Sequence, residues 1–440
     1  MVKFLLKKIN CVFIITISLV VLNGCKKNTN SIPVNHLVNK PNIILLLADD
    51  YGYEIPTCDG GQSYETPNID LMAQNGMRFT QCHATPLCSP SRVELMTGKY
   101  NFRNYTDWGL LGLEQRTFAN MLSDAGYATC IAGKWQLDGG NEAIHTFGFN
   151  VYSVFEAFSH DDRARYKSPR IYQDGNYLPD SFTNSKYADD IFTDYILNFI
   201  QTNHSKKTPF FVYYPLSLTH SPFSPTPDDP EFAGWDPNSP SAPQFFPSMV
   251  KYMDKKIGQI VAEIKNLGIE DSTIILFSGD NGTAQEITSK FNGMRIKGGK
   301  GLTTEAGTHV PLIAYAPGFV SSSVNNDLID FTDFLLTLAG IANIPIPVNY
   351  GVLDGVSFYP GLIGEAGTPR DWIFCHFDPH PGQDTLERYV QNINYKYYED
   401  GRFYNIVSDI LELNPIPDAL LSPDEEKIKQ GFKDVLSQLH

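Results

Sequence analysis

The sequence predicts an α/β fold with a large, mixed but mainly parallel sheet flanked by helices. The first observation is a series of short, continuously apolar runs, which is typical of strands buried on both faces. The second is that segments with helical periodicity lie between these runs, as they do in parallel sheets. The third is a change of pattern near residue 370, after which the sequence predicts a small antiparallel subdomain.

The individual elements follow from these patterns. Apolar runs predict buried, parallel strands at 42–48, 128–132, 210–214, 273–277 and 310–315. Helical spacing predicts helices at 69–76, 117–126, 185–201, 246–267 and 330–339. Near the end, residues 389–398, the turn Asp400-Gly401 and residues 402–407 predict a β-hairpin. We therefore expect a main domain at 41–369 and a C-terminal antiparallel subdomain at 370–440.

The first residues have the pattern of a targeting segment. Three lysines precede an apolar run at 9–22, which is too short to span a bilayer and fits a signal peptide at 1–24. The run ends in LNGC at 22–25, which resembles the lipobox of bacterial lipoproteins and makes Cys25 the expected lipidation site. A secretory peptide with a chance cysteine is the alternative. Residues 25–40 are polar and predict a tether between the anchor and the fold.

Composition excludes some functions. The formal net charge is −15, which disfavours nucleic-acid binding because nothing offsets repulsion from phosphates. An anionic substrate would need a locally positive pocket. Beyond residue 25 the cysteines are Cys58, Cys82, Cys88, Cys130 and Cys375, an odd number without CxxC spacing. This pattern indicates neither a disulfide framework nor a cysteine zinc site.

Polar residues follow four of the predicted strands directly. Because ligand sites in parallel sheets gather at the carboxyl ends of strands, we expect these residues to lie near one another. Carboxylate and amide oxygens suit a hard cation such as calcium or magnesium. Helix capping or turn formation is the alternative for any single aspartate. The residues are Asp49, Asp50, Lys134, His220, Asp280 and Asn281.

The segment Cys88-Ser89-Pro90-Ser91-Arg92, followed by Thr97-Gly98, resembles the type I, formylglycine-dependent sulfatases of the alkaline phosphatase superfamily. Their signature is C-x-P-S-R. Further matches occur in the family order: Asp-Asp-x-Gly at 49–52, Gly-Tyr at 126–127, Gly-Lys-Trp at 133–135, His-x-Pro at 220–222, Ser-Gly-Asp-Asn-Gly at 278–282, Gly-Lys-Gly at 299–301 and His-Val-Pro at 309–311. The resemblance covers residues 40–410 and implies an alkaline phosphatase-like fold with the catalytic domain at 41–369.

The resemblance also implies a mechanism. A maturation enzyme would oxidise Cys88 to formylglycine, whose hydrated aldehyde attacks the sulfur of a sulfate ester. The metal and Arg92 would favour ionisation of this nucleophile. Lys134 and Lys300 would hold sulfate oxygens, and His220 would help to protonate the leaving alcohol. One Ca²⁺ per chain would bind Asp49, Asp50, Asp280, Asn281 and the modified residue 88.

One position departs from the family pattern. Gly-Lys-Trp is followed in much of the family by a histidine that can remove a proton when sulfate is released, but here it is followed by Gln136. A neutral amide orients a hydroxyl but cannot act as a general base. The release step is therefore the one that the sequence puts in doubt.

Several other residues allow two interpretations. His309 is expected either in the wall of the sulfate site or in a structural role. His83 and Cys82 are expected to pack or to lie in a loop. The HFDPH segment at 376–380 is expected to contribute to substrate specificity rather than to bind metal. Trp108, Arg103, Arg163 and Arg165 could contact a sugar, although surface placement is the simpler expectation for each.

The leading hypothesis is a sulfatase that acts on a sulfated carbohydrate in the periplasm or at the cell surface, held to a bacterial membrane only by its lipid. Two alternatives stay open: a phosphonate or phosphate ester hydrolase of the same superfamily, and a non-catalytic glycan-binding lipoprotein. Long segments at 137–185 and 221–247 are expected to shape the substrate site.

Overall fold

The computed structural model describes residues 40–159, 164–383 and 386–439, all within the unit Asn35–His440. The predicted signal peptide, Cys25, nearly all of the tether and Arg163 lie outside the described residues. In the part of the chain that is described, no helix is both long and apolar enough to cross a membrane.

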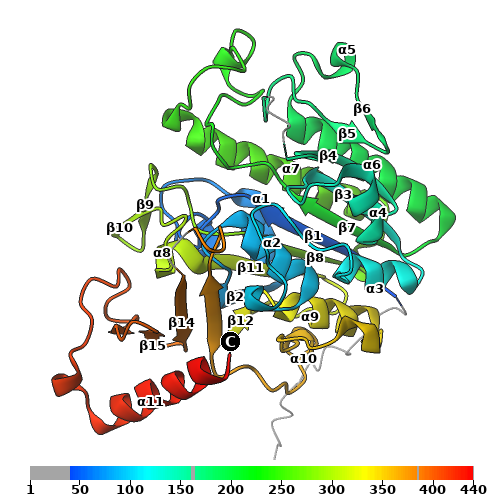
Figure 1. Ribbon diagram of the computed structural model, residues 1–440. Coiled ribbons are helices and arrows are strands. Elements are labelled where there is room, and N and C mark those ends of the chain that lie inside the picture. Colours follow the sequence, from blue (N-terminus) through cyan, green and yellow to red (C-terminus); the bar gives the residue numbers. More distant parts are fainter. Residues whose placement is uncertain (1–39, 160–163, 384–385, 440) are drawn as a thin grey trace, which may run out of the picture. The chain divides into compact units, whose positions relative to one another are not determined.

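A ten-stranded sheet forms the centre of the fold (Figure 1). The strands β8, β1, β7, β3 and β4 are neighbours in that order and run parallel, which confirms the prediction of a mainly parallel sheet. In spatial order the sheet comprises β12 (Ser323–Asp330), β2 (Met77–His83), β11 (His309–Tyr315), β8 (Thr273–Gly279), β1 (Asn42–Ala48), β7 (Phe210–Pro215), β3 (Ala128–Lys134), β4 (Val151–Phe155), β5 (Tyr172–Gln173) and β6 (Asn176–Tyr177).

The strand predicted at 310–315 is present as β11, but it is antiparallel to both of its neighbours, β2 and β8. The expectation of a parallel strand there was wrong. A continuous apolar run reports burial on both faces and carries no information on direction. After β8 the chain forms the short hairpin of β9 (Thr288–Phe291) and β10 (Met294–Lys297), which lies outside the main sheet.

Helices cover both faces of the sheet (Figure 1). Alternate residues of β1 enter two different cores, Ile43, Leu45 and Leu47 on one face and Ile44, Leu46 and Ala48 on the other. The first core also includes residues of α2 (Cys88–Thr97), α3 (Phe118–Asp124) and α9 (Asp333–Ala342). The second includes residues of α1 (Pro67–Gln74), α6 (Ala188–Lys206) and α7 (Phe246–Asn266).

Helix α7 illustrates why these segments fold as helices. Its buried residues Met249, Met253, Ile257, Ile260 and Ile264 recur every three or four positions and so form one apolar stripe. A proline lies in its first turn, where no intrahelical N–H bond is lost. The shorter helices are α4 (Gly140–Thr146), α5 (Asp180–Thr183), α8 (Glu305–Thr308) and α10 (Tyr359–Leu362).

A separate four-stranded antiparallel sheet lies near the C-terminus, as predicted. It comprises β13 (Ile373–Phe377), β14 (Glu387–Gln391), β15 (Tyr395–Tyr398) and β16 (Phe403–Asn405), and α11 (Pro423–Gln438) contacts β14 and β15. The single hairpin arm predicted at 389–398 is two strands. Asn392 breaks it, because its side-chain oxygen accepts from the backbone N–H groups of Asn394 and Tyr395 and closes a turn. The domain boundary at residue 370 stays a prediction.

Candidate active site

A cluster of acidic and amide side chains lies at the carboxyl ends of the two central strands. Ala48 of β1 pairs with Gly279 of β8, so the residues that follow both strands emerge side by side. The backbone N–H of Asp50 donates to Asp280 Oδ1 at 3.1 Å, and Asn281 Nδ2 donates to Asp50 Oδ1 at 2.9 Å. All of these side chains are buried, as is that of Asp49.

This cluster fits a hard cation. The atoms that it offers as metal ligands are oxygens, which calcium and magnesium prefer. Asn281 Oδ1 is buried without a hydrogen-bond partner, so one strong acceptor is left over. Burial and the charge of Asp49 raise the pKa of Asp280, and a cation shared by the two carboxylates would relieve that repulsion. Single ligand atoms of Asp49, Asp280 and Cys88 lie within 4.8 Å of one another.

Basic side chains surround the carboxylates. Arg92 donates to Asp280 Oδ2 from Nη2 at 2.7 Å and from Nε at 3.0 Å. Lys134 Nζ lies 2.9 Å from Asp49 Oδ2, and Lys300 Nζ lies 2.8 Å from Asp50 Oδ2. The site therefore offers the locally positive wall that an anionic substrate needs in an acidic protein.

Cys88 is the first residue of α2, so the partial positive charge of the helix N-terminus lies at its side chain. The thiol is buried, and Gln136 Nε2 lies 3.1 Å from Sγ. Burial raises the pKa of the thiol, and Lys134 offsets this only in part. The unmodified cysteine is thus not held as a thiolate, the form in which sulfur is a nucleophile.

His220 follows β7 and faces the same cluster. Its Nε2 lies 3.8 Å from Asp50 Oδ2, and its Nδ1 contacts the carbonyl of Ser221. Burial and the nearby charge of Arg165 lower the pKa of His220 to about 4. The imidazole is therefore neutral near pH 7 in the structure as it stands.

These side chains open into one cavity of about 340 Å³. One part of the cavity is lined by the basic side chains that surround the acidic cluster. Its outer part is lined by the aromatic rings of Trp108 and Phe158 and by the carboxylates of Asp138 and Glu156. Its lining residues are Cys88, Trp108, Gly109, Lys134, Gln136, Asp138, Glu156, Phe158, Ser159, Arg165, His220 and Lys300.

Arg165 was expected at the surface, but its side chain is only 10% exposed and belongs to the site. It lies 2.8 Å from Asp49 Oδ2 and 3.0 Å from Glu156 Oε1. No local pattern indicates this placement, because Arg165 lies in an irregular segment after β4 and not at the end of a strand.

Other candidates are placed as follows. His309 is not among the residues that line the cavity, and its Nε2 lies 3.0 Å from the carbonyl of Thr80. Arg103 pairs with Asp354 outside the cavity. Trp108 lines the cavity and stacks on His380 with ring centroids 5.5 Å apart, which brings the HFDPH segment near the cavity.

The two long segments differ in their contributions. Residues of 137–185 supply five of the described lining positions, whereas the proline-rich segment 221–247 supplies none of them. The expectation that both segments shape this cavity thus finds support only for the first.

Comparison with known proteins identifies the family. Residues 41–344 match the family model described as Sulfatase. The chain is 31% identical over 355 residues to N-acetylgalactosamine-6-sulfatase of Mus musculus, covering 73% of this chain and 66% of that protein. It is 30% identical over 375 residues to arylsulfatase A of Homo sapiens, covering 76% and 70%. The chain thus matches about two thirds of the length of these relatives.

Solved structures share the fold. Ps i-CgsB in complex with k-i-k-neocarrahexaose superimposes with a TM-score of 0.77 at 22% identity, covering 91% of this chain and 92% of that chain. A protein in complex with its substrate D-Glucosamine-2-N, 6-O-disulfate gives 0.73 at 22% identity, covering 91% and 98%. The phosphonate monoester hydrolase of Agrobacterium radiobacter gives 0.65 at 19% identity, covering 91% and 95%.

These structural likenesses show the architecture, a large mixed sheet with a small antiparallel sheet, and do not by themselves separate sulfate from phosphonate chemistry. The family match, which spans both central strands and the segment from Cys88 to Lys300, and the relatives named as sulfatases favour sulfate esters. The chain belongs to the sulfatase family of sulfuric ester hydrolases.

Proposed function

We propose that this protein hydrolyses sulfate esters of a carbohydrate, with calcium at the Asp49–Asp280 cluster and a formylglycine made from Cys88. One observation carries the proposal. The cysteine of the CSPSR segment lies at a helix N-terminus and lines a cavity, which Lys134 and Lys300 also line while they contact Asp49 and Asp50 of the oxygen-rich cluster.

Two groups would be supplied to this site. A formylglycine at position 88 would supply an oxygen nucleophile where the thiol now lies. It would replace a thiol whose pKa is raised by burial. A calcium ion held by Asp49, Asp50, Asp280 and Asn281 would supply positive charge beside the transferring group.

The chain's own residues do the remaining work. Lys134, Lys300 and Arg165 line the cavity and attract the sulfate, and they meet the negative charge that develops on it. Arg92 is fixed by two hydrogen bonds to Asp280 and keeps its charge at the base of the site. His220 also lines the cavity, and its imidazole would give a proton to the leaving alcohol.

The carbohydrate part of the proposal rests on the outer cavity. Trp108 and Phe158 offer apolar ring faces of the kind on which sugar rings pack, and Asp138 and Glu156 offer acceptors for sugar hydroxyls. A relative is named for a sulfated amino sugar, and two structural neighbours were solved with saccharides. We infer a sulfated saccharide as the substrate class.

We also propose that the protein works as a lipoprotein of the periplasm or cell surface. The support is the apolar run at 9–22 and the LNGC at 22–25. A formylglycine-generating maturation enzyme is the partner that the Cys88 segment requires.

The test is mass spectrometry of the peptide that contains Cys88, from protein made together with a maturation enzyme. Conversion of the thiol to the aldehyde lowers the peptide mass by about 18 Da. Protein that carries this change should release sulfate from sulfated saccharides, and a Cys88→Ala variant should not. An unmodified Cys88 in the presence of a competent maturation enzyme would favour a glycan-binding protein without catalysis.

Comparison of matched aryl esters separates the remaining alternative. We expect an aryl sulfate to be hydrolysed with a higher kcat/KM than the corresponding aryl phosphate or phenylphosphonate. The reverse order would make the protein a phosphate or phosphonate ester hydrolase that shares this fold.

A further inference from the structure

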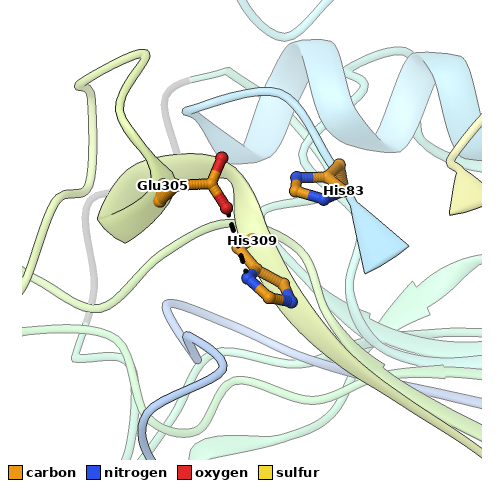
Figure 2. Close-up of side chains that lie close together, drawn as sticks. All are labelled: His83, Glu305 and His309. Carbon is orange, nitrogen blue, oxygen red and sulfur yellow. Dashed lines mark ion pairs between the residues drawn. The ribbon is translucent and has the colours of Figure 1, made fainter. Parts of the chain in front are cut away.

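Two histidines and a glutamate that do not line the cavity meet at the start of β11 (Figure 2). His83 is the last residue of β2 and His309 is the first of β11, and the two are directly paired across the strands. Glu305 is the first residue of α8, one helical turn before His309. One ligand atom from each of the three lies within 4.8 Å of the other two.

The polar atoms of this cluster are poorly satisfied. His83 is 2% exposed, and neither of its ring nitrogens has a hydrogen-bond partner. Glu305 is 4% exposed, and its Oε1 accepts no hydrogen bond. A buried polar group without a partner costs about 1–3 kcal/mol, so two adjacent ones call for a physical reason.

The orientation of the His309 ring places two hydrogen-bond acceptors opposite each other. Its Nε2 lies 3.0 Å from the carbonyl oxygen of Thr80, which can only accept, so Nε2 carries the hydrogen. In the neutral ring, Nδ1 then presents a lone pair to Glu305 Oε2, 3.4 Å away, which is also an acceptor. Two acceptors that face each other in this way call for a proton, carried by His309 or Glu305, or for a metal ion between them.

A proton on His309 would satisfy only part of the cluster. It would pair His309 with Glu305 and leave both nitrogens of His83 without partners. Lys396 does not complete the cluster either, because its Nζ is 3.8 Å from Glu305 Oε1 and lies closer, at 3.0 Å, to Glu412. A metal ion would use His83, Glu305 and His309 together.

We propose that His83, Glu305 and His309 form a binding site for a divalent transition-metal ion of the zinc class. Two imidazole nitrogens and one carboxylate oxygen are a donor set that such ions take in proteins. The hydrogen bond from His309 to the Thr80 carbonyl is the usual outer partner of a metal-bound histidine. Burial lowers the pKa of His83 to about 3, so this ring is in the neutral form that ligates metals.

The site would act as a structural clamp. The rings of His83 and His309 now lie nearly parallel, with centroids 4.8 Å apart and 24° between their planes, and binding would tilt them toward a shared ion. This would tie β2 to β11 and hold α8, which follows Lys300 by a few residues. Lys396 of β15 contacts the same segment through the Thr303 carbonyl, so the clamp also borders the C-terminal sheet.

Metal content of the mature, full chain tests the proposal. After equilibration with Zn²⁺ in excess calcium and removal of free metal, we expect one zinc per wild-type chain by elemental mass spectrometry. His83→Leu should lose it. His376→Leu is the matched control, because His376 also has a buried nitrogen without a partner but lies outside the cluster, and it should keep the zinc.

Thermal stability gives a second readout, because a histidine that binds no metal would not make the Tm respond to zinc. Zinc should raise the Tm of the wild type and leave that of His83→Leu unchanged. With a strong chelator present, His83→Leu should be at least as stable as the wild type, because leucine removes two unpaired polar atoms. If His83→Leu does not fold, Glu305→Gln keeps the side-chain shape and should likewise lose zinc.

Equal zinc content in the wild type, in His83→Leu and in Glu305→Gln would overturn the proposal. It would place any bound zinc elsewhere, such as near Asp49 and Cys88. So would a wild-type Tm that does not respond to zinc, in which case an ion pair of protonated His309 with Glu305 accounts for the cluster. The measurement does not rest on the proposed activity. It can be made on a Cys88→Ser protein, which is expected to be unable to turn over a sulfate ester.

Discussion

Arg165 donates a hydrogen bond from Nη1 to Asp49 Oδ2 at 2.8 Å, and this joins an irregular segment to the end of the central strand. Lys134 contacts the same oxygen at 2.9 Å, so one carboxylate oxygen holds two cations on the cavity wall. Although burial alone would raise the pKa of Asp49, these neighbours together with His220 and Arg92 lower it well below its ordinary value.

Arg165→Ala should lower kcat/KM for a sulfated substrate by about 100-fold, because it removes a charge that faces the transferring group. Arg165→Lys should recover part of the loss, since it keeps the charge but cannot bridge Asp49 and Glu156 as a fork does. The measurement is steady-state kinetics with Tm recorded for each variant.

Arg402→Ala supplies the control for that series. Arg402 pairs with Asp400 near the surface of the C-terminal sheet, and its side chain is 39% exposed. We expect unchanged kcat/KM for this variant. An Arg165→Ala enzyme with wild-type kinetics would remove Arg165 from the proposed site.

The cluster of Asp49, Asp50, Asp280 and Asn281 was predictable from sequence and the position of Arg165 was not, for a physical reason. A buried parallel strand has a recognisable apolar run, and the residues that follow neighbouring strands must lie together, which places Asp49 beside Asp280. Arg165 reaches the site through a loop whose path depends on tertiary packing. The loop carries no periodicity that could be read in advance.

The strand β2 was missed for a related reason. Its sequence, MRFTQCH, mixes polar and apolar residues because the strand is only partly buried, next to the edge strand β12. Without β2, the pairing that sets His83 against His309 could not be foreseen. His83 and Glu305 are 222 residues apart in the sequence, and only the antiparallel register of β2 with β11 joins them.

Calcium removal should destabilise the protein. A ligand at 100 times its Kd stabilises the native state by about 2.7 kcal/mol, so treatment with a calcium chelator should lower the Tm measurably. Asp280→Asn should abolish this calcium response, because it removes one of the charges that bind the ion. The measurement is thermal unfolding with and without calcium.

Asp254→Asn is the matched control for Asp280→Asn. Asp254 is also a buried carboxylate, but it accepts from the backbone N–H groups of Asn68 and Ile69 at the start of α1. This variant should have a lower Tm and keep the full calcium response. A calcium response that survives in Asp280→Asn would place the ion at another site.

His220 should matter most for substrates with poor leaving groups. An alcohol leaving from a sugar needs a proton, whereas a nitrophenolate does not, so His220→Gln should lower kcat/KM more for a sugar sulfate than for a nitrophenyl sulfate. Equal losses on both substrates would assign His220 to binding and not to proton transfer.

The pH dependence follows from the lowered pKa of His220. Because this pKa is about 4, the protonated fraction rises about tenfold for each unit that the pH falls from 7 toward 4. The ratio of wild-type to His220→Gln kcat/KM on a sugar sulfate should therefore increase as the pH is lowered. Taking the ratio cancels the titration of other groups, such as the carboxylates of the cluster.

Gln136→His should change the step in which sulfate leaves the enzyme. Gln136 Nε2 lies 3.1 Å from Cys88 Sγ, and its Oε1 is buried without a partner, so the residue at 136 is close enough to act on residue 88. A glutamine cannot take a proton there, but a histidine can. The backbone at 136 has a φ of 62°, a conformation that histidine tolerates better than most residues.

We therefore expect wild-type enzyme to show a pre-steady-state burst of alcohol release of about one equivalent per chain, followed by slower turnover. In Gln136→His the burst should shrink and kcat should rise, because release would no longer limit the rate. Gln136→Asn, which keeps an amide but withdraws it from residue 88, should lower kcat and retain the burst. A wild-type enzyme without a burst, and with kcat unaffected by Gln136→His, would show that another group or water already removes the proton fast enough.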